Sequence, residues 1–369
     1  MGGRKGALEG LDMISSFWRG RKVFITGHTG FKGGWLALWL RQLEAQVSGF
    51  ALNAPTTPSL FELAELASDI ASTVGDIRDR GALEAALHAS EAEVVFHLAA
   101  QPLVRRSYTE PVETYATNVI GTVNLLEAIR STPSVRAVVV VTSDKCYHNR
   151  EWQWGYRENE ALGGFDPYSS SKACAELVTA AYRSSYFSDG ADGGKVAVAS
   201  ARAGNVIGGG DWAEDRLLPD MLRAFAAGRP VRIRHPQARR PWQHVLEPLS
   251  GYLQLAESLF ADGPAHATAW NFGPSEETDH TVQWIVQRTA ALWGDGARWE
   301  LDEAAQPHEA NQLRLDSTRA LLQLRWKPRW NLEQALARVV DWHRAQLDGR
   351  NMRAFTLEQI EDYTRWTNY

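Results

Sequence analysis

The chain alternates short apolar runs with longer segments of mixed polarity. Apolar runs of strand length lie at 21–26, 46–52, 70–77, 94–100, 138–142 and 195–202. Between them, segments such as 35–43 and 115–130 carry apolar residues three and four positions apart, which is the spacing of an amphipathic helix. Strands that alternate with helices favour a parallel sheet with right-handed crossovers. The predicted fold class is therefore α/β, built on a doubly wound parallel sheet.

A glycine-rich turn joins the first strand to the first helix, with the spacing G-x-x-G-x-x-G. Glycines at such a turn allow a tight bend, close approach of the backbone to a pyrophosphate, and tight helix packing. The N-terminus of the following helix then faces the phosphates. The turn predicts a Rossmann-like domain that binds a dinucleotide. The residues assigned to the cofactor here are Gly27, Thr29, Gly30, Phe31, Lys32 and Gly33.

The ends of the second and third strands extend the predicted cofactor site. Asn53 stands where an acidic residue that binds the ribose is expected. An amide can still bond the ribose hydroxyl groups, which favours NAD over NADP, although it carries no charge that would repel a 2′-phosphate. Asp76 and Ile77 lie where an adenine could rest, with a plain surface turn as the alternative interpretation.

The fourth strand ends on small residues. Ala99 and Ala100 leave room for the cofactor to pass, and Gln101 extends beside it. Asn118, on the helix predicted at 115–130, is also assigned to the cofactor. His97 lies inside an apolar run, which favours a core histidine over a catalytic one.

The run Val138 to Val141 is the strongest strand signal in the chain. Four β-branched residues in a row predict a strand that is buried on both faces of a parallel sheet. The strand leads directly to Ser143, Asp144 and Lys145. Because ligands bind outside the carboxyl ends of strands in open α/β sheets, these side chains are predicted to lie on the floor of a cleft. A polar exit from the strand without chemistry is the alternative.

A second acid–base pair lies on the next predicted helix, which opens at Asp166. Tyr168 and Lys172 are four residues apart and therefore share one face of that helix. Tyrosine is a poor base at neutral pH, because its pKa is near 10. A lysine ammonium nearby, together with a positively charged nicotinamide ring, would lower that pKa. The pair predicts a redox site beside the glycine turn.

Five segments of the chain resemble a known family. The segments at 26–33, 97–101 and 168–172, which are TGHTGFKG, HLAAQ and YSSSK, resemble extended short-chain dehydrogenases/reductases that act on nucleotide sugars. More narrowly, TSDKCY at 142–147 and NAPTTPSLF at 53–61 resemble CDP-glucose 4,6-dehydratases. The resemblance runs from about residue 17 to residue 345 and is looser in the last third. It implies NAD as cofactor and CDP-glucose as the nucleotide-sugar substrate.

The resemblance also implies a catalytic role for five residues. Tyr168, held by Lys172 and helped by Ser143, removes the proton from the sugar O4 while hydride passes from C4 to NAD. Asp144, in its protonated form, gives its proton to the departing C6 hydroxyl. Related dTDP-glucose dehydratases have a glutamate after this aspartate as the C5 base, whereas this chain has Lys145. Lys145 is either that base or a charge that orients Asp144 or binds the substrate.

Substrate contacts are expected mainly from the second half of the chain. Guanidinium groups suit a diphosphate because they engage it bidentately, and Arg216 and Arg234 are assigned to it, with a solvated surface role as the alternative for each. By resemblance, Asn205 bonds the sugar or its diphosphate, and Arg240 matches a substrate position of the family. Ser107 reaches a sugar hydroxyl or faces solvent. A late substrate loop is expected at 307–309 and a helix cap at 315–320, with Gln312 in the place of the family's usual arginine.

Composition excludes several other function classes. The 369 residues carry a net charge of −5 and no basic stripe, so a nucleic-acid partner is not expected. No apolar run approaches the roughly 20 residues of a membrane span, and no apolar signal core is present. A cytoplasmic protein without a membrane partner is therefore expected. The two cysteines exclude a disulfide framework, and the histidines form no ligand spacings with them, so no metal site is expected.

Three parts of the chain are predicted. They are a loose N-terminal extension at 1–16, a dinucleotide-binding domain with the catalytic residues at 17–203, and a smaller α/β domain at 204–369. The last part is expected to bind mainly the substrate and to return some segments to the first domain. Its glycine-rich start, 204–212, is expected to be a flexible loop. By resemblance, helices such as 115–130 and 168–185 pair in a homodimer or homotetramer.

The favoured function is dehydration of CDP-glucose to CDP-4-dehydro-6-deoxyglucose, a deoxysugar precursor for a bacterial surface glycan such as a lipopolysaccharide O-antigen. A nucleotide-sugar 4-epimerase shares Tyr168, Lys172 and the glycine turn. It needs no acid for C6, however, and so leaves Asp144 unexplained. A non-catalytic NAD-binding regulatory protein is the third hypothesis, and the intact set of Tyr168, Lys172 and Asp144 speaks against it.

Overall fold

The computed structural model describes residues 16–187, 196–274, 280–294, 296–302 and 312–366. Nearly all of the extension expected at 1–16, the loop at 189–194 and the late substrate loop at 307–309 lie outside these ranges. No helix in the described ranges has the length and apolar content that crossing a bilayer requires.

A seven-stranded sheet forms the centre of the molecule, in the order β10-β6-β5-β4-β1-β2-β3, and every strand pair in it is parallel. This confirms the predicted Rossmann-like doubly wound sheet. The strand order reverses between β1 and β4, which is the switch point where such sheets bind ligands. The strands are β1 (Lys22–Thr26), β2 (Gln46–Ala51), β3 (Ala71–Val74), β4 (Val94–His97), β5 (Ala137–Val141), β6 (Ala197–Arg202) and β10 (Ala269–Asn271).

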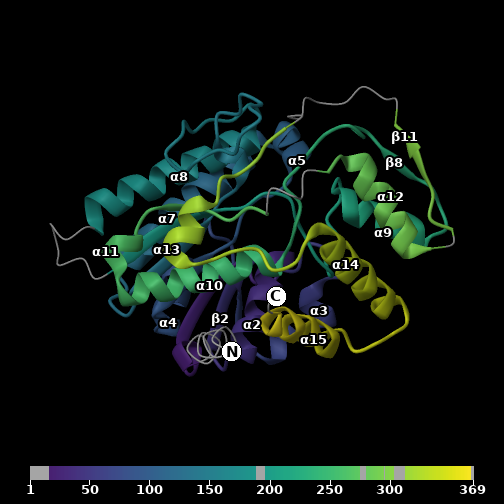
Figure 1. Cartoon of the computed structure of the whole chain (residues 1–369). Helices are drawn as coiled ribbons and strands as arrows, with labels where there is room; N and C mark the ends of the chain where they lie inside the picture. The colour runs from purple at the N-terminus through teal and green to yellow at the C-terminus, as the bar shows by residue number, and fades with distance from the viewer. Residues whose placement is uncertain (1–15, 188–195, 275–279, 295, 303–311, 367–369) are drawn as a thin grey trace, which may run out of the picture.

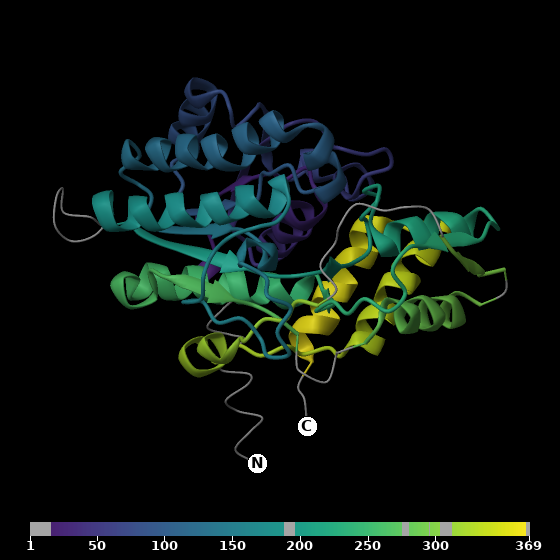
Figure 2. The ribbon, with the colours of Figure 1, turned by 90° about the horizontal axis from the view of Figure 1, so that it is seen from above.

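Helices cover both faces of this sheet (Figures 1 and 2). Val138 and Val140 of β5 belong to the hydrophobic cluster on one face, and Val139 and Val141 belong to the cluster on the other, as predicted for a strand buried on both sides. The first face carries α4 (Arg80–Ser90), α7 (Gly121–Arg130) and α8 (Pro167–Tyr186). The second face carries α2 (Phe31–Gln42), α10 (Leu246–Ala261), α13 (Thr318–Leu324) and α15 (Met352–Arg365).

Short helical elements connect these layers. They are α3 (Leu60–Leu63), a 3-10 turn at Leu66–Ser68, α5 (Val104–Thr109), α6 (Pro111–Tyr115), a π turn at Ala116–Ile120, a 3-10 turn at Asp144–Cys146 and α11 (Gly263–His266). The helix predicted at 115–130 therefore begins earlier, at Pro111, and contains the π turn.

A second lobe lies beside the sheet and is seen at the right of Figure 1. Two small parallel sheets, β7–β9 and β8–β11, belong to it. Its elements are β7 (Val206–Ile207), α9 (Leu217–Ala226), β8 (Val231–Ile233), β9 (Gln243–His244), α12 (Val282–Trp293), β11 (Trp299–Leu301) and α14 (Leu332–Leu347). The second half of the chain also contributes β10 to the central sheet.

The expectation of a flexible loop at 204–212 is wrong. Gly208, Gly209 and Gly210 are buried, and each lies against a different part of the molecule. A Cβ on Gly208 would be 2.9 Å from the Phe31 ring, and one on Gly209 would be 2.0 Å from Trp342. Gly208 thus allows close packing against α2 and Gly209 allows close packing against α14, which composition alone does not distinguish from flexibility.

Candidate active site

The glycine turn has the geometry of a dinucleotide cradle. Gly27 has φ +81°, and a Cβ there would be 2.7 Å from the Ala99 nitrogen, so this position makes the tight turn. A Cβ on Gly33 would be 2.2 Å from the Gly27 carbonyl oxygen, so this position lets α2 pack closely. Gly30 is less crowded, and no side chain caps the N-terminus of α2. The cradle therefore fits a pyrophosphate.

The ribose and adenine end of the predicted site lies beside β2 and β3. The Thr29 hydroxyl donates to the Leu52 carbonyl at 2.9 Å, which ties the glycine turn to the residue before the exposed Asn53. The carboxylate of Asp76 accepts hydrogen bonds from Arg78, and these bonds lower the pKa of Asp76. The Ile77 side chain is 4% exposed and lies in the core, so it offers little surface to an adenine.

Gln101 and Asn118 brace the loop that follows β4. The backbone N–H of Gln101 donates to Asn118 Oδ1 at 2.8 Å. Asn118 Nδ2 donates to the Gln101 carbonyl and to the Ser171 hydroxyl of α8. These bonds hold Ala99 and Ala100, which are half-buried, beside the N-terminal part of α8. The bracing role was not visible from the sequence, because it joins three separate elements.

His97 is a core histidine, as predicted. Its Nδ1 is 2.7 Å from the Thr26 hydroxyl and its Nε2 is 3.1 Å from the Thr122 hydroxyl. Burial lowers the pKa of His97 to about 3, so the ring is neutral. Both nitrogens are used inside the fold, which leaves neither for proton transfer to a ligand.

The exit from β5 holds Asp144 in a defined position. Ser143 caps the 3-10 turn by accepting the Lys145 N–H, and its hydroxyl donates to Asp144 Oδ1 at 3.0 Å. Asp144 is 3% exposed, whereas the Lys145 side chain is half-buried. The three residues predicted from the strand end therefore do lie together, with the carboxyl group innermost.

Tyr168 and Lys172 face the same region from α8. Asp166 caps this helix through the Ser169 N–H, and the Lys172 amine donates to the Val141 carbonyl at the end of β5. Burial raises the pKa of Tyr168 to about 12; the hydrogen bond with Ser143 opposes this rise and the charge of Asp144 adds to it. Burial lowers the pKa of Lys172 to about 8. The chain's own groups thus raise the pKa of Tyr168 overall, and the lowering expected from Lys172 together with a nicotinamide ring stays a prediction.

A buried ion pair behind this site was missed by the sequence analysis. Glu176, one turn beyond Lys172 on α8, accepts hydrogen bonds from Thr142, Ser200 and Arg202. The Glu176 and Arg202 side chains are each 3% exposed and 2.8 Å apart. Burial acts to raise the pKa of Glu176, but Arg202 and the hydrogen bonds lower it overall. The charge of Glu176 raises the pKa of Lys172. The spacing of four residues between Lys172 and Glu176 places both on one face of α8, and this could have been predicted from the sequence.

Two further cations lie near the catalytic residues. Burial, together with the charges of Lys172 and Arg216, lowers the pKa of Lys32 to about 7, and the charge of Asp144 opposes this lowering. Arg216 donates to Asp211 at 2.9 Å, and its charge lowers the pKa of Tyr168. Lys32 and Arg216 therefore belong to the same electrostatic cluster as Asp144.

The other predicted substrate residues are spread more widely. Ser107 is buried in α5, and its hydroxyl donates to the Val104 carbonyl. Arg234 Nη2 lies 3.3 Å from Asp215 Oδ1, in a pocket that Arg105 also lines. Asn205 and Arg240 are both half-buried on the segments that flank β7 and β9. Arg234 thus lines this pocket together with Arg105, whereas Arg216 does not.

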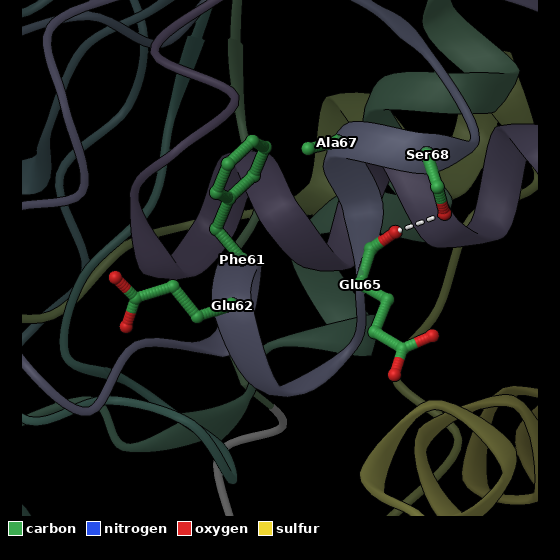
Figure 3. A pocket seen from close by; sticks show the side chains of 5 residues that line it. All are labelled: Phe61, Glu62, Glu65, Ala67 and Ser68. Carbon is green, nitrogen blue, oxygen red and sulfur yellow. Dashed lines mark hydrogen bonds between the residues drawn. The ribbon is translucent and has the colours of Figure 1, made fainter.

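Another pocket lies at α3 (Figure 3). The carboxylates of Glu62 and Glu65 point away from the Phe61 ring, and Ser68 donates to the Glu65 carbonyl. None of the predicted site residues lines it. In the described ranges, no group of three or more His, Cys, Asp or Glu residues could hold a metal ion.

Comparison with known proteins places these features in a family. Residues 24–339 match the family model described as GDP-mannose 4,6 dehydratase. A CDP-glucose 4,6-dehydratase from Salmonella typhimurium is 54% identical over 349 residues, which cover 94% of this chain and 97% of that protein. A dTDP-glucose 4,6-dehydratase from Xanthomonas campestris is 26% identical over 342 residues, covering 86% of this chain and 92% of that protein.

The fold is similar to that of solved nucleotide-sugar enzymes. The structure titled MoeE5 in complex with UDP-glucuronic acid and NAD has a TM-score of 0.73 and 26% identity. The match covers 88% of this chain and 99% of that one. The similarity extends over both lobes, since it spans most of the chain.

Proposed function

The chain belongs to the GDP-mannose 4,6-dehydratase family, and from this we propose that it is an NAD-dependent hydro-lyase that converts CDP-glucose to CDP-4-dehydro-6-deoxyglucose. The observation that carries the proposal is the 54% identity, over 94% of the chain, to a CDP-glucose 4,6-dehydratase. The glycine cradle and the cluster around Asp144 and Tyr168 support it, because they bring a dinucleotide site and an acid–base site to one sheet edge.

The first proposed step is oxidation at C4. Tyr168 takes the proton from the sugar O4, with Ser143 as its hydrogen-bond partner. Lys172 is proposed to support it from the same face of α8. Because burial raises the pKa of Tyr168 to about 12, the phenol needs additional positive charge nearby before it can act as a base. When bound, NAD supplies that charge, together with a hydride acceptor for C4 and later a hydride donor for C6. Within the chain itself, the charge of Arg216 lowers the pKa of Tyr168.

The second proposed step is loss of water across C5 and C6. The 4-ketone acidifies the C5 proton, and a base removes it. Asp144 gives a proton to the C6 hydroxyl, so the C6–O bond breaks and the electrons of the C5–H bond form the C5–C6 double bond. Lys145 is proposed as the C5 base, with orientation of Asp144 as its alternative role. C5 regains a proton as C6 receives the hydride that bound NAD would supply, which gives the 4-dehydro-6-deoxy product. The buried position of Asp144, which is 3% exposed, supports its role as the acid.

The nucleotide diphosphate is proposed to lie toward the second lobe. Arg216, Arg234 and Arg240 are the proposed diphosphate contacts, and Asn205 the proposed sugar contact, because their guanidinium and amide groups suit those partners. Ser107 contributes, in this proposal, through the loop that it stabilises. We propose the same division of the chain, with 17–203 binding the cofactor and 204–369 mainly binding the substrate. Asn53 and the cradle residues favour NAD over NADP.

We propose that two copies pair through α6, the π turn and α8. Val112, Ile120 and Leu177 are large apolar residues on this outer face and are 82%, 52% and 58% exposed. Such residues in one area favour a protein interface. A homodimer, or a homotetramer made from two dimers, would cover them. The proposed location is the cytoplasm, where nucleotide sugars for surface glycans are made.

The proposal is tested by supplying the purified protein with NAD and, separately, CDP-glucose, dTDP-glucose, UDP-glucose and GDP-mannose. Mass spectrometry should show loss of one water from CDP-glucose at the highest rate. An unchanged mass with inverted C4 would replace dehydration by epimerisation. Binding of NAD without any product would favour a regulatory protein.

A further inference from the structure

The carboxyl group of Asp144 rests between two neighbours. One oxygen, Oδ1, accepts the Ser143 hydroxyl at 3.0 Å. The other, Oδ2, lies against the backbone of Gly204, at the end of the segment that leaves β6. The Asp144 N–H also donates to the Ala203 carbonyl, at 3.4 Å. The backbone at 203–204 therefore supports both the main chain and the side chain of Asp144.

Gly204 leaves no room for a side chain. A Cβ built there would lie 2.2 Å from Asp144 Oδ2, 2.8 Å from Asp144 Cγ and 2.8 Å from Pro241 Cγ. Contacts below about 3.0 Å are strongly repulsive, so one neighbour would have to move. Pro241 is buried and its ring is rigid, whereas the carboxyl group can rotate about its own bonds. An added methyl group would therefore displace the Asp144 carboxyl.

Backbone conformation does not explain this glycine. Gly27 and Gly210 have φ angles of +81° and +80°, which favour glycine whatever surrounds them. Gly204 is not among the positive-φ glycines of the described ranges. The contact with Asp144 and Pro241 is thus the physical reason for glycine at this position.

We propose that Gly204 is a positioning residue for the acid step, because its missing side chain makes the space in which the Asp144 carboxyl is held toward the leaving hydroxyl. The inference rests on the proposed dehydration, in which the Asp144 proton moves to the C6 oxygen as the C6–O bond breaks. Removal of a well-placed general acid typically slows a reaction by about 10²–10⁴-fold. A displaced acid should fall at the lower end of that range.

The test uses the full-length protein with NAD and CDP-glucose. Gly204→Ala should keep hydride transfer from C4, seen as NADH absorbance in a single turnover, within about threefold of wild type. Release of the dehydrated product should fall by about 10²-fold, as expected for loss of a general acid. Gly81→Ala is the matched control, because a Cβ there would be 3.6 Å from Asp79 Oδ1, an ordinary contact far from the site. This control should dehydrate at the wild-type rate.

A double variant separates positioning from a general structural effect. If Gly204 acts through Asp144, Gly204→Ala should cost no further activity once Asp144 is Asn, because residues that act as a unit are not additive. The proposal would be overturned if Gly204→Ala lowered the dehydration rate by the same factor in the Asp144→Asn background as in wild type. It would also be overturned if Gly204→Ala alone dehydrated CDP-glucose within threefold of the wild-type rate.

If Gly204→Ala folds too poorly for kinetics, a measurement of Tm can test the contact with Asp144 instead. Asp144→Ala removes the atoms that clash, so Gly204→Ala should lower Tm in the wild-type background and lower it less when combined with Asp144→Ala. Equal losses of Tm in both backgrounds would show that Asp144 is not the neighbour that matters. Failure of the wild-type protein to dehydrate any of the four sugars would instead refute the proposed function and leave this stability test intact.

Discussion

Replacement of Glu176 by Gln removes one charge from the buried pair behind the catalytic site. Glu176 and Arg202 are 2.8 Å apart and each is 3% exposed, so solvent screens the pair little. At a charge separation of about 4 Å and an effective dielectric constant of about 20, their attraction is about 4 kcal/mol. Removal of one partner from such a pair typically costs about 3–5 kcal/mol, because the other charge stays buried without compensation. We expect Glu176→Gln to lower the free energy of unfolding by that amount.

The assay is urea unfolding followed by tryptophan fluorescence. Glu127→Gln is the matched control, since Glu127 pairs with Arg130 on the surface of α7 at 2.9 Å, with exposed fractions of 20% and 37%. An exposed pair contributes about 0–1 kcal/mol. A loss for Glu176→Gln no larger than that of the control would refute the reasoning about burial.

The same substitution has a kinetic signature. Burial lowers the pKa of Lys172 to about 8, and the charge of Glu176 works against that lowering. Without the Glu176 charge, Lys172 should lose its proton at a lower pH. The alkaline limb of the kcat/KM profile should then move to lower pH in Glu176→Gln. An unmoved limb, combined with the loss of stability, would restrict Glu176 to a structural role.

Three further outcomes are expected. Once bound NAD has lowered the pKa of Tyr168 below that of Lys172, which is about 8, kcat/KM of the wild-type protein with saturating NAD should fall about tenfold per pH unit above pH 8. A kcat/KM that is flat to pH 10 under these conditions would contradict the role of the Lys172 ammonium. Burial raises the pKa of Glu247 from 4.5 to about 7, so the folded state keeps a proton that the unfolded state releases. The free energy of unfolding should therefore fall by roughly 3 kcal/mol as the pH rises from 4.5 to 7. Calorimetry should show a smaller dependence of stability on pH for Glu247→Gln. Ile120→Glu and Leu177→Glu should each shift the protein toward monomer in sedimentation velocity, whereas an unchanged mass would place the interface elsewhere.

Much of the fold could be predicted because its signals are local. The run Val138 to Val141 defined a fully buried strand, since only a two-sided environment suits four β-branched residues in a row. The glycine turn between a strand and a helix predicted a cradle whose geometry the structure shows in detail. Tyr168 and Lys172 were predicted to share a helix face from their spacing alone. Each of these inferences needs only neighbours within a few residues.

Only the tertiary structure decided which distant residues meet. Glu176 and Arg202 are 26 residues apart, and their pairing depends on the packing of α8 against β6. The glycines at 208–210 were expected to give flexibility, but contacts with Phe31 and Trp342 make Gly208 and Gly209 packing positions. Asp144 and Gly204 touch because β5 and β6 are neighbours in the sheet, which no periodicity encodes. The sequence by itself thus determined the strands, the cradle and the identity of the reactive groups. The charge states and positions of these groups were decided by burial and long-range contacts, because they depend on every element that packs around the groups.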